Sequence, residues 1–327
     1  MASNRKIARS LGAVAVMAMA LAACSSQGGA QDTAGPASAD GPPLRFAMVT
    51  HAPAGDTFFD IIRKGADAAA AESNVEYTYS NDGDPTRQAV LIENAVNSGV
   101  QGLLVSVPAP AALTPAIKKA VDKGIPVVGF NAGLDTYKDW GALMYFGQDE
   151  SVAGQSAGAR LKEEGAAKVL CVIQAQGQAQ LEARCNGVEQ GFGGTVERIN
   201  VTGTDLTAVR STLESKLRQD PSISHVLTLG APFALTAVQA KQSSGSQAEI
   251  VTFDTNPELV GAIESGDVKW AIDQQPYLQG YLSVDFMALY LRNGNVIGGG
   301  EAVATGPSFI DSTNIAKVAE FAKAGTR

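Results

Sequence analysis

Side chains that could bind a small polar molecule follow several short apolar runs of the sequence. They are His51, Asp56, Phe58, Phe59, Asn131, Arg184, Asp254 and Gln274. In parallel α/β sheets, ligands bind at the carboxyl ends of the strands, so we expect these side chains to face one cleft. Carboxylate, amide and guanidinium groups hydrogen-bond to hydroxyls, and aromatic faces pack on the C–H face of a sugar ring. The set predicts a site for a neutral polyhydroxylated molecule.

The same sequence offers little for catalysis, metal binding or nucleic-acid binding. It has two histidines and three cysteines, and its formal charge of −8 disfavours binding to phosphates. A G-x-S-x-G pattern at 154–158 lies inside a predicted helix, whereas a nucleophile elbow needs a strand turning sharply into a helix. No nucleotide-binding loop pattern is present. We therefore expect no catalytic residue, no metal and no cofactor.

The elements that must position these residues alternate regularly from Leu44 onward. Predicted strands are 45–50, 75–80, 102–107, 126–130, 143–146, 168–174, 196–201, 225–229, 249–253 and 268–273. Predicted helices are 57–72, 86–98, 111–123, 150–164, 180–192, 206–219, 232–242, 257–265 and 277–292. Strands separated by helices of this length indicate parallel βαβ units, and ten strands favour two doubly wound, Rossmann-like α/β lobes over one sheet.

The N-terminal segment is typical of an export signal. Residues 1–23 hold a basic start and an apolar stretch too short to span a membrane, and Leu-Ala-Ala-Cys24 follows. This ending resembles the bacterial lipobox, which implies that Cys24 is lipidated; an export signal cut elsewhere is the alternative. Residues 24–43 are rich in Gly, Ser, Pro and Ala and predict a flexible tether. We expect a protein anchored by lipid to the outer face of the cytoplasmic membrane.

From Leu44 onward the chain resembles the type 1 periplasmic binding proteins of the ribose-binding branch, which serve bacterial ABC sugar importers. The resemblance rests on Asp56-Thr-Phe-Phe, Gly124-Ile-Pro-Val-Val-Gly-Phe-Asn, Arg184-Cys-Asn-Gly, Phe253-Asp and Ala271-Ile-Asp-Gln-Gln-Pro in that order. It implies that the residues named above line a sugar site, with His51 the weakest candidate. It also implies an N-terminal lobe of residues 44–146 plus 275–305, a C-terminal lobe of 147–274 plus 306–327, and a hinge of three crossings.

The resemblance implies capture of a neutral monosaccharide, polyol or small glycoside by hinge closure, with delivery to an ABC permease and its cytoplasmic ATPase. We expect a monomer and no enzyme activity. Two polar anchors of the ribose-binding branch are missing, because Asn131-Ala132 replaces Asp-Arg and Gly230-Ala231 replaces Asn-Asp. Either the site has room for a bulkier ligand or it hydrogen-bonds to fewer hydroxyls of the ligand.

Cys171 and Cys185 remain once Cys24 is assigned to the anchor. An exported protein meets an oxidising compartment, which favours a disulfide between them; two buried free thiols are the alternative.

Three other functions stay open. A transcriptional regulator would need a helix-turn-helix before Leu44, where the export signal lies. A surface hydrolase would need an acid, base or nucleophile set. A sensor that presents its ligand to a receptor is harder to separate from a transporter component.

Overall fold

The computed structural model describes residues 41–53 and 55–327. The predicted signal peptide 1–23, Cys24 and most of the predicted tether 24–43 lie outside the described residues. None of the helices in the described part of the chain is long and apolar enough to cross a membrane.

The first sheet is a six-stranded parallel sheet with the order β11-β5-β4-β3-β1-β2. Its strands are β1 (Leu44–Thr50), β2 (Val75–Asn81), β3 (Gly102–Val105), β4 (Val127–Phe130), β5 (Met144–Gly147) and β11 (Val303–Ala304). The central strands are buried and rich in Val, Leu and Phe, as expected for a parallel sheet covered on both faces.

The second sheet has the order β12-β10-β9-β8-β6-β7 and is parallel except for β12, which pairs antiparallel with β10. Its strands are β6 (Lys168–Ile173), β7 (Thr195–Asn200), β8 (His225–Thr228), β9 (Glu249–Phe253), β10 (Trp270–Asp273) and β12 (Ser308–Asp311). The strand numbers show that the chain passes between the sheets three times: after β5, after β10 and after β11.

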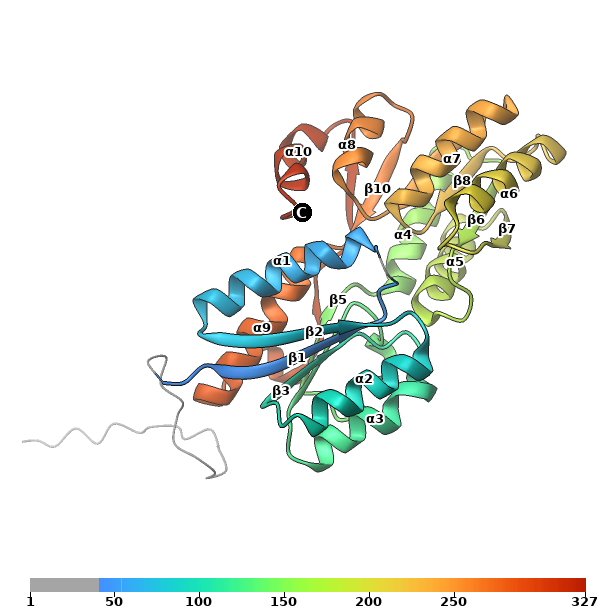
Figure 1. The fold of residues 1–327 in the computed structure, drawn as a ribbon. Coiled ribbons are helices and arrows are strands. Elements are labelled where there is room, and N and C mark those ends of the chain that lie inside the picture. Colours follow the sequence, from blue (N-terminus) through green and yellow to red (C-terminus); the bar gives the residue numbers. More distant parts are fainter. Residues whose placement is uncertain (1–40, 54) are drawn as a thin grey trace, which may run out of the picture. The chain divides into compact units, whose positions relative to one another are not determined.

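Helices cover both faces of each sheet. In the first sheet α1 and α9 pack on one face while α2 and α3 pack on the other (Figure 1). In the second sheet α4 and α5 cover one face, and α6, α7, α8 and α10 cover the other. Their bounds are α1 (Thr57–Glu72), α2 (Pro85–Asn97), α3 (Pro110–Asp122), α4 (Glu150–Glu163), α5 (Ala179–Phe192), α6 (Leu206–Gln219), α7 (Ala231–Ser244), α8 (Pro257–Glu264), α9 (Pro276–Asn293) and α10 (Ile315–Lys323).

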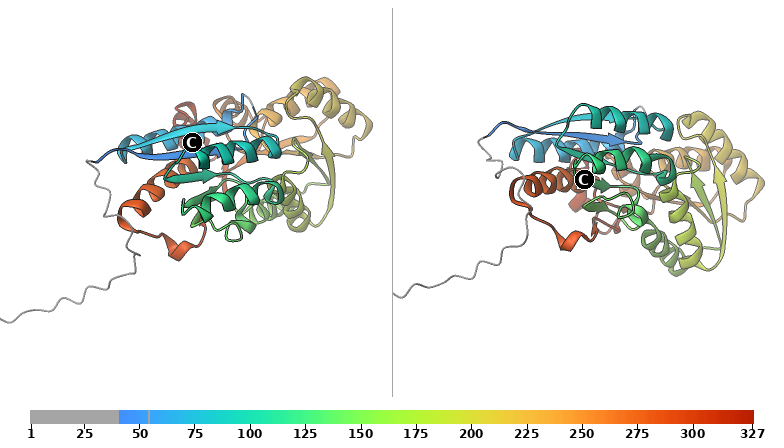
Figure 2. Two further views of the ribbon diagram at one scale, coloured as in Figure 1. Left: turned by 60° about the horizontal axis from the view of Figure 1, so that its bottom comes forward. Right: turned by 90° about the horizontal axis from the view of Figure 1, so that it is seen from below.

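Two helix pairs approach unusually closely, and glycines make this possible. A Cβ atom on Gly280 of α9 would lie 1.9 Å from the Ile62 backbone oxygen of α1. In the second sheet, a Cβ on Gly154 of α4 would lie 2.2 Å from the Arg184 backbone oxygen of α5. The two helices of each pair run side by side in the views of Figure 2. The glycines of the G-x-S-x-G pattern therefore serve helix packing, and Ser156 donates to the Val152 carbonyl of its own helix.

The predicted fold class, two parallel α/β sheets with flanking helices, is confirmed. The ten predicted strands and nine predicted helices are all present, with ends that shift by no more than a few residues. The elements predicted from the sequence did not include β11, β12 and α10. The limits proposed for the two lobes stay predictions.

Candidate functional site

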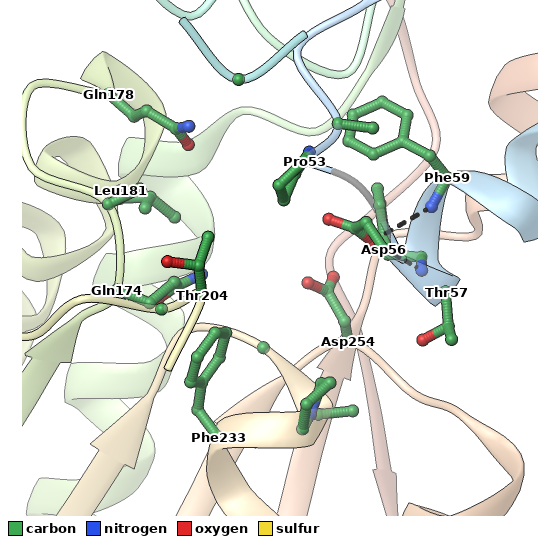
Figure 3. Close-up of a pocket in the computed structure, with 18 of the residues that line it drawn as sticks. Pro53, Asp56, Thr57, Phe59, Gln174, Gln178, Leu181, Thr204, Phe233 and Asp254 are labelled. Carbon is green, nitrogen blue, oxygen red and sulfur yellow. Dashed lines mark hydrogen bonds between the residues drawn. The ribbon is translucent and has the colours of Figure 1, made fainter. Parts of the chain in front are cut away.

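A cavity of about 1360 Å³ opens at the carboxyl ends of strands from both sheets. All eight residues predicted from the sequence line it: His51, Asp56, Phe58, Phe59, Asn131, Arg184, Asp254 and Gln274. They reach one place because parallel strands end at the same edge of a sheet, so the loops after β1, β4, β9 and β10 converge. Figure 3 shows Asp56 and Asp254 facing the same space.

Asp56 and the two phenylalanines form one wall of the cavity at the start of α1. The Asp56 Oδ1 caps this helix by accepting from the backbone N–H groups of Phe58 (2.8 Å) and Phe59 (3.4 Å). Burial raises the pKa of Asp56, and these two hydrogen bonds partly oppose the rise. The two rings meet edge to face with centroids 5.4 Å apart. Phe59 is buried in the core, whereas Phe58 is half-buried and offers the more accessible surface.

A row of polar side chains crosses the cavity at the strand ends. Asn131 donates to Gln274 Oε1 (3.2 Å), and Gln274 Nε2 donates to Asp254 Oδ1 (2.7 Å). Gln279 Nε2 also donates to Gln274 Oε1 (2.9 Å), which fixes the orientation of that amide. Asn131 and Asp254 have positive φ angles of 62° and 65°. Such strained backbone at a strand end is typical of functional sites, where it aims a side chain.

Arg184 is almost fully buried, at 3% exposed, and is held by an acidic partner that the sequence reading did not single out. Its Nε and Nη2 donate to the two carboxylate oxygens of Glu150 (2.6 and 3.0 Å), and Nη1 donates to the Leu229 carbonyl (3.0 Å). Nη1 also lies 3.7 Å from Asp254 Oδ2. Burial lowers the pKa of the guanidinium, but the carboxylates of Glu150 and Asp254 outweigh it and keep the pKa raised.

Asp254 is the carboxyl whose protonation is most altered by the cavity. Burial raises its pKa to about 7, against the lowering effects of Arg184 and of the hydrogen bond from Gln274. Asp254 does not cap the following helix, because Asn256 caps α8 by accepting from the Leu259 N–H. Asp254 therefore remains available to a ligand.

His51 is buried and neutral. Burial, with the charge of Arg184, lowers its pKa to about 3. Gln180 Nε2 lies 3.2 Å from its Nε2, and Ser106 Oγ lies 2.8 Å from its Nδ1. Because the Gln180 amide nitrogen can only donate, the network assigns the ring proton to Nδ1, where it is donated to Ser106. His51 thus acts as a hydrogen-bonding group and carries no charge at neutral pH.

Several cavity residues were missed by the sequence reading. The most prominent are Phe233, Gln174 and Thr204, which also line the cavity. Phe233 projects from the first turn of α7 into the space near Thr204 and Asp254 (Figure 3). The sequence does place Phe233 among the residues that follow a strand, shortly after Gly230 and the end of β8. An aromatic residue after Pro232 is equally typical of a helix packed in the core, so its position alone did not mark it as a cavity residue.

Cys171 on β6 and Cys185 on α5 form a disulfide with a Cα–Cα distance of 6.1 Å. Cys185 directly follows Arg184, so the covalent link ties the helix that carries this arginine to the sheet. Among residues 41–53 and 55–327, no group of three or more His, Cys, Asp or Glu side chains could hold a metal ion.

Comparison with known proteins identifies the family of the chain. The family model of the periplasmic binding protein domain matches residues 46–295, most of the chain. The chain belongs to this family. A curated relative is the xylose/arabinose-binding protein of Sulfolobus acidocaldarius, 28% identical over 75% of this chain and 65% of its own length. The ribose import binding protein of Bacillus subtilis is 23% identical over 70% of this chain and 75% of its own length. The chain thus spans about two thirds of the first of these relatives.

A much closer likeness is found among solved structures. A carbohydrate transporter from Acidothermus cellulolyticus, in complex with myo-inositol, is 60% identical, with a TM-score of 0.86 over 88% of this chain and all of that one. A solute-binding protein of an ABC transporter from Burkholderia graminis, in complex with D-arabinose, has a TM-score of 0.76 over 84% of this chain and 97% of that one. At 21% identity, the second shows the shared fold alone. The relatives named here are binding or transport proteins.

Proposed function

We propose that this protein captures a neutral sugar or polyol in the cavity and delivers it to an ABC import permease, without chemical change. The observation that carries the proposal is the polar row Asn131–Gln274–Asp254 beside the Phe58 wall. Amides and a carboxylate in a line suit adjacent hydroxyls on a ring, and an aromatic face suits its C–H side. The myo-inositol complex of the 60% identical relative supports a cyclic polyol as one ligand class.

The two-sheet arrangement supports capture by closure. Asn131 follows a strand of the first sheet and Asp254 follows a strand of the second, so a ligand bonded to both stabilises whichever conformation brings them together. We infer two lobes, 44–146 with 275–305 and 147–274 with 306–327, joined at the three crossings between the sheets. The three crossings act as a hinge between the lobes, and a permease would recognise the closed form.

The location proposed is the outer face of the cytoplasmic membrane, with a lipid on Cys24 and residues 25–43 as tether. The form proposed is a monomer.

The test is a thermal-shift screen of the chain from residue 44 onward against myo-inositol, other cyclitols, pentoses, hexoses and small glycosides, followed by calorimetry. A ligand present at a hundred times its Kd stabilises the folded state by about 2.7 kcal/mol, which a melting curve detects. We expect at least one neutral polyol or sugar to bind with micromolar or better affinity. Turnover of a glycoside or ester substrate, or stabilisation by none of these compounds, would overturn the proposal.

A further inference from the structure

Glu150 is a buried carboxylate in the first turn of α4, and only 7% of it is exposed. Both of its oxygens accept hydrogen bonds from Arg184, at 2.6 and 3.0 Å, in a two-pronged pair. Oε2 also accepts from Gln148 Nε2 (2.8 Å), so the carboxylate is held from two sides. Because Glu150 is absent from the wall of the large cavity, it acts on a ligand through Arg184.

This pairing changes what Arg184 can recognise. A planar guanidinium facing a cavity ordinarily binds a carboxylate or phosphate with two parallel hydrogen bonds. Here the Nε and Nη2 edge that would make such a pair is taken by Glu150, and Nη1 donates to the Leu229 carbonyl. The ring of Phe253 lies under the guanidinium, 4.6 Å from its carbon. The charge is therefore balanced, and the free N–H groups of Arg184 can serve a neutral hydroxyl.

The remaining charges around the cavity are mainly negative. The described residues of its wall carry five acidic side chains, Asp56, Asp82, Asp84, Asp254 and Glu258, and two basic ones, Arg87 and Arg184. Arg87 is paired with Asp82 at 2.7 Å. Both of these cations are paired. An anion that enters the cavity therefore meets unpaired carboxylates and, among the described lining residues, no available positive charge. Burying it there without a partner is costly.

We propose that Glu150 is a specificity-determining positioning residue, which makes the site reject anionic sugars such as uronates and sugar phosphates by neutralising and orienting Arg184. This inference rests on the proposed function, because it assumes that the cavity binds a sugar or polyol. To that function the inference adds that anionic sugars are excluded and that Glu150 is the side chain responsible.

The test compares charged and neutral ligands of the same shape. In the unaltered protein, D-glucuronamide should bind at least tenfold more tightly than D-glucuronate in calorimetry at pH 7.5. This comparison needs no variant. Equal affinities for the amide and the anion, or tighter binding of the anion, would overturn the proposal.

The variant Glu150→Gln keeps the size of the side chain and one acceptor oxygen but removes the charge. We expect its affinity for D-glucuronate to rise at least tenfold, while its affinity for myo-inositol changes less than tenfold. The matched control is Glu163→Gln, an exposed acid at the other end of α4 and outside the cavity wall, which should alter the glucuronate affinity by less than threefold. In the double variant Glu150→Gln with Arg184→Gln the gain should disappear, since the gain depends on the guanidinium.

An unchanged glucuronate affinity in folded Glu150→Gln protein, or a gain that survives the loss of Arg184, would refute the role of Glu150. These results are separate from a failure of the proposed function. If no neutral compound binds the unaltered protein, the proposed function fails, yet the effect of Glu150→Gln on glucuronate binding can still be measured.

Discussion

Asp254 shows how a buried carboxyl in a binding site makes stability depend on pH. In the folded, ligand-free protein its pKa is about 7, against an ordinary value of 3.8. Between these values the folded state holds a proton that the unfolded chain has released. The free energy of unfolding contributed by this group is therefore highest below about pH 4 and falls as the pH rises to about 7.

The variant Asp254→Asn tests this directly, because the amide cannot ionise and its oxygen can still accept from Gln274. We expect the free energy of unfolding of the variant, minus that of the unaltered protein, to grow from pH 4 to pH 7 and then to level off. Urea unfolding at several pH values measures it. A difference that stays flat over this range would show that Asp254 has an ordinary pKa.

His51 makes the free energy of unfolding change with pH in the opposite direction to Asp254, so it is a control for the sign of that change. Its pKa falls from 6.5 to about 3 on folding, so the unfolded chain binds the extra proton between these values. The stability contributed by neutral His51 is present above pH 6.5 and is lost as the pH falls toward 3. The variant His51→Gln, measured in the same way, should therefore gain relative stability on acidification, where Asp254→Asn loses it.

At the scale of elements, the crossing of α1 and α9 depends on having no side chain at the contact. Gly280 has no room for a Cβ atom, because the nearest backbone oxygen belongs to the facing helix and cannot rotate away. Overpacking of this kind costs about 1–3 kcal/mol or more. The helices α1 and α9 also begin beside the cavity, at Thr57 and Pro276, so a shift of their crossing would move Phe58 and Gln274.

We expect Gly280→Ala to lower the free energy of unfolding by at least about 2 kcal/mol and to weaken ligand binding. The matched control is Gly261→Ala in α8, where a Cβ would meet nothing within 4 Å. That change should be neutral or stabilising by up to about 1 kcal/mol, because alanine favours a helix. Thermal and urea unfolding measure both. Equal effects of the two substitutions would contradict the close-packing argument.

Most elements could be predicted from the sequence because their local signals agree. The run Gly102–Val105 is wholly apolar and bounded by a glycine, and α1 repeats apolar residues at Phe58, Ile62, Ala66 and Ala69. The two residues of β11 carry no such signal, since their pairing with β5 is set by the distant chain. In contrast, α10 could have been found, because Ile315, Val318, Ala319 and Ala322 repeat at helical spacing and are buried.

Part of the site could also be predicted from local sequence pattern. The ends of strands follow from local pattern, so the sequence alone was enough to place Asn131, Asp254 and Gln274 together. Glu150 could not be found in this way, because an acid in the first turn of a helix is common and favourable without any partner. Only the packing of α4 against α5 brings it to Arg184.

At the scale of the whole molecule, attachment to the membrane is assigned to one residue, Cys24, outside the described part of the chain. We expect the full-length protein to partition into the detergent phase of a phase-separating detergent when it is expressed in a bacterium that lipidates lipoboxes. The variant Cys24→Ser should move to the aqueous phase, while ligand affinity changes less than twofold, because Cys24 is far in the sequence from the residues that line the cavity. Equal partitioning of the two forms would show that Cys24 is not lipidated.

The order of the strands along the chain also bears on how the protein folds. Among the described strands, β11 and β12 come after all the others, at residues 303–311, and one belongs to each sheet. A chain that emerges from a ribosome or an export channel with its N-terminus first therefore cannot complete either sheet until this stretch has followed. Until then β5 and β10 are edge strands with unpaired backbone groups, and such edges can pair with other chains.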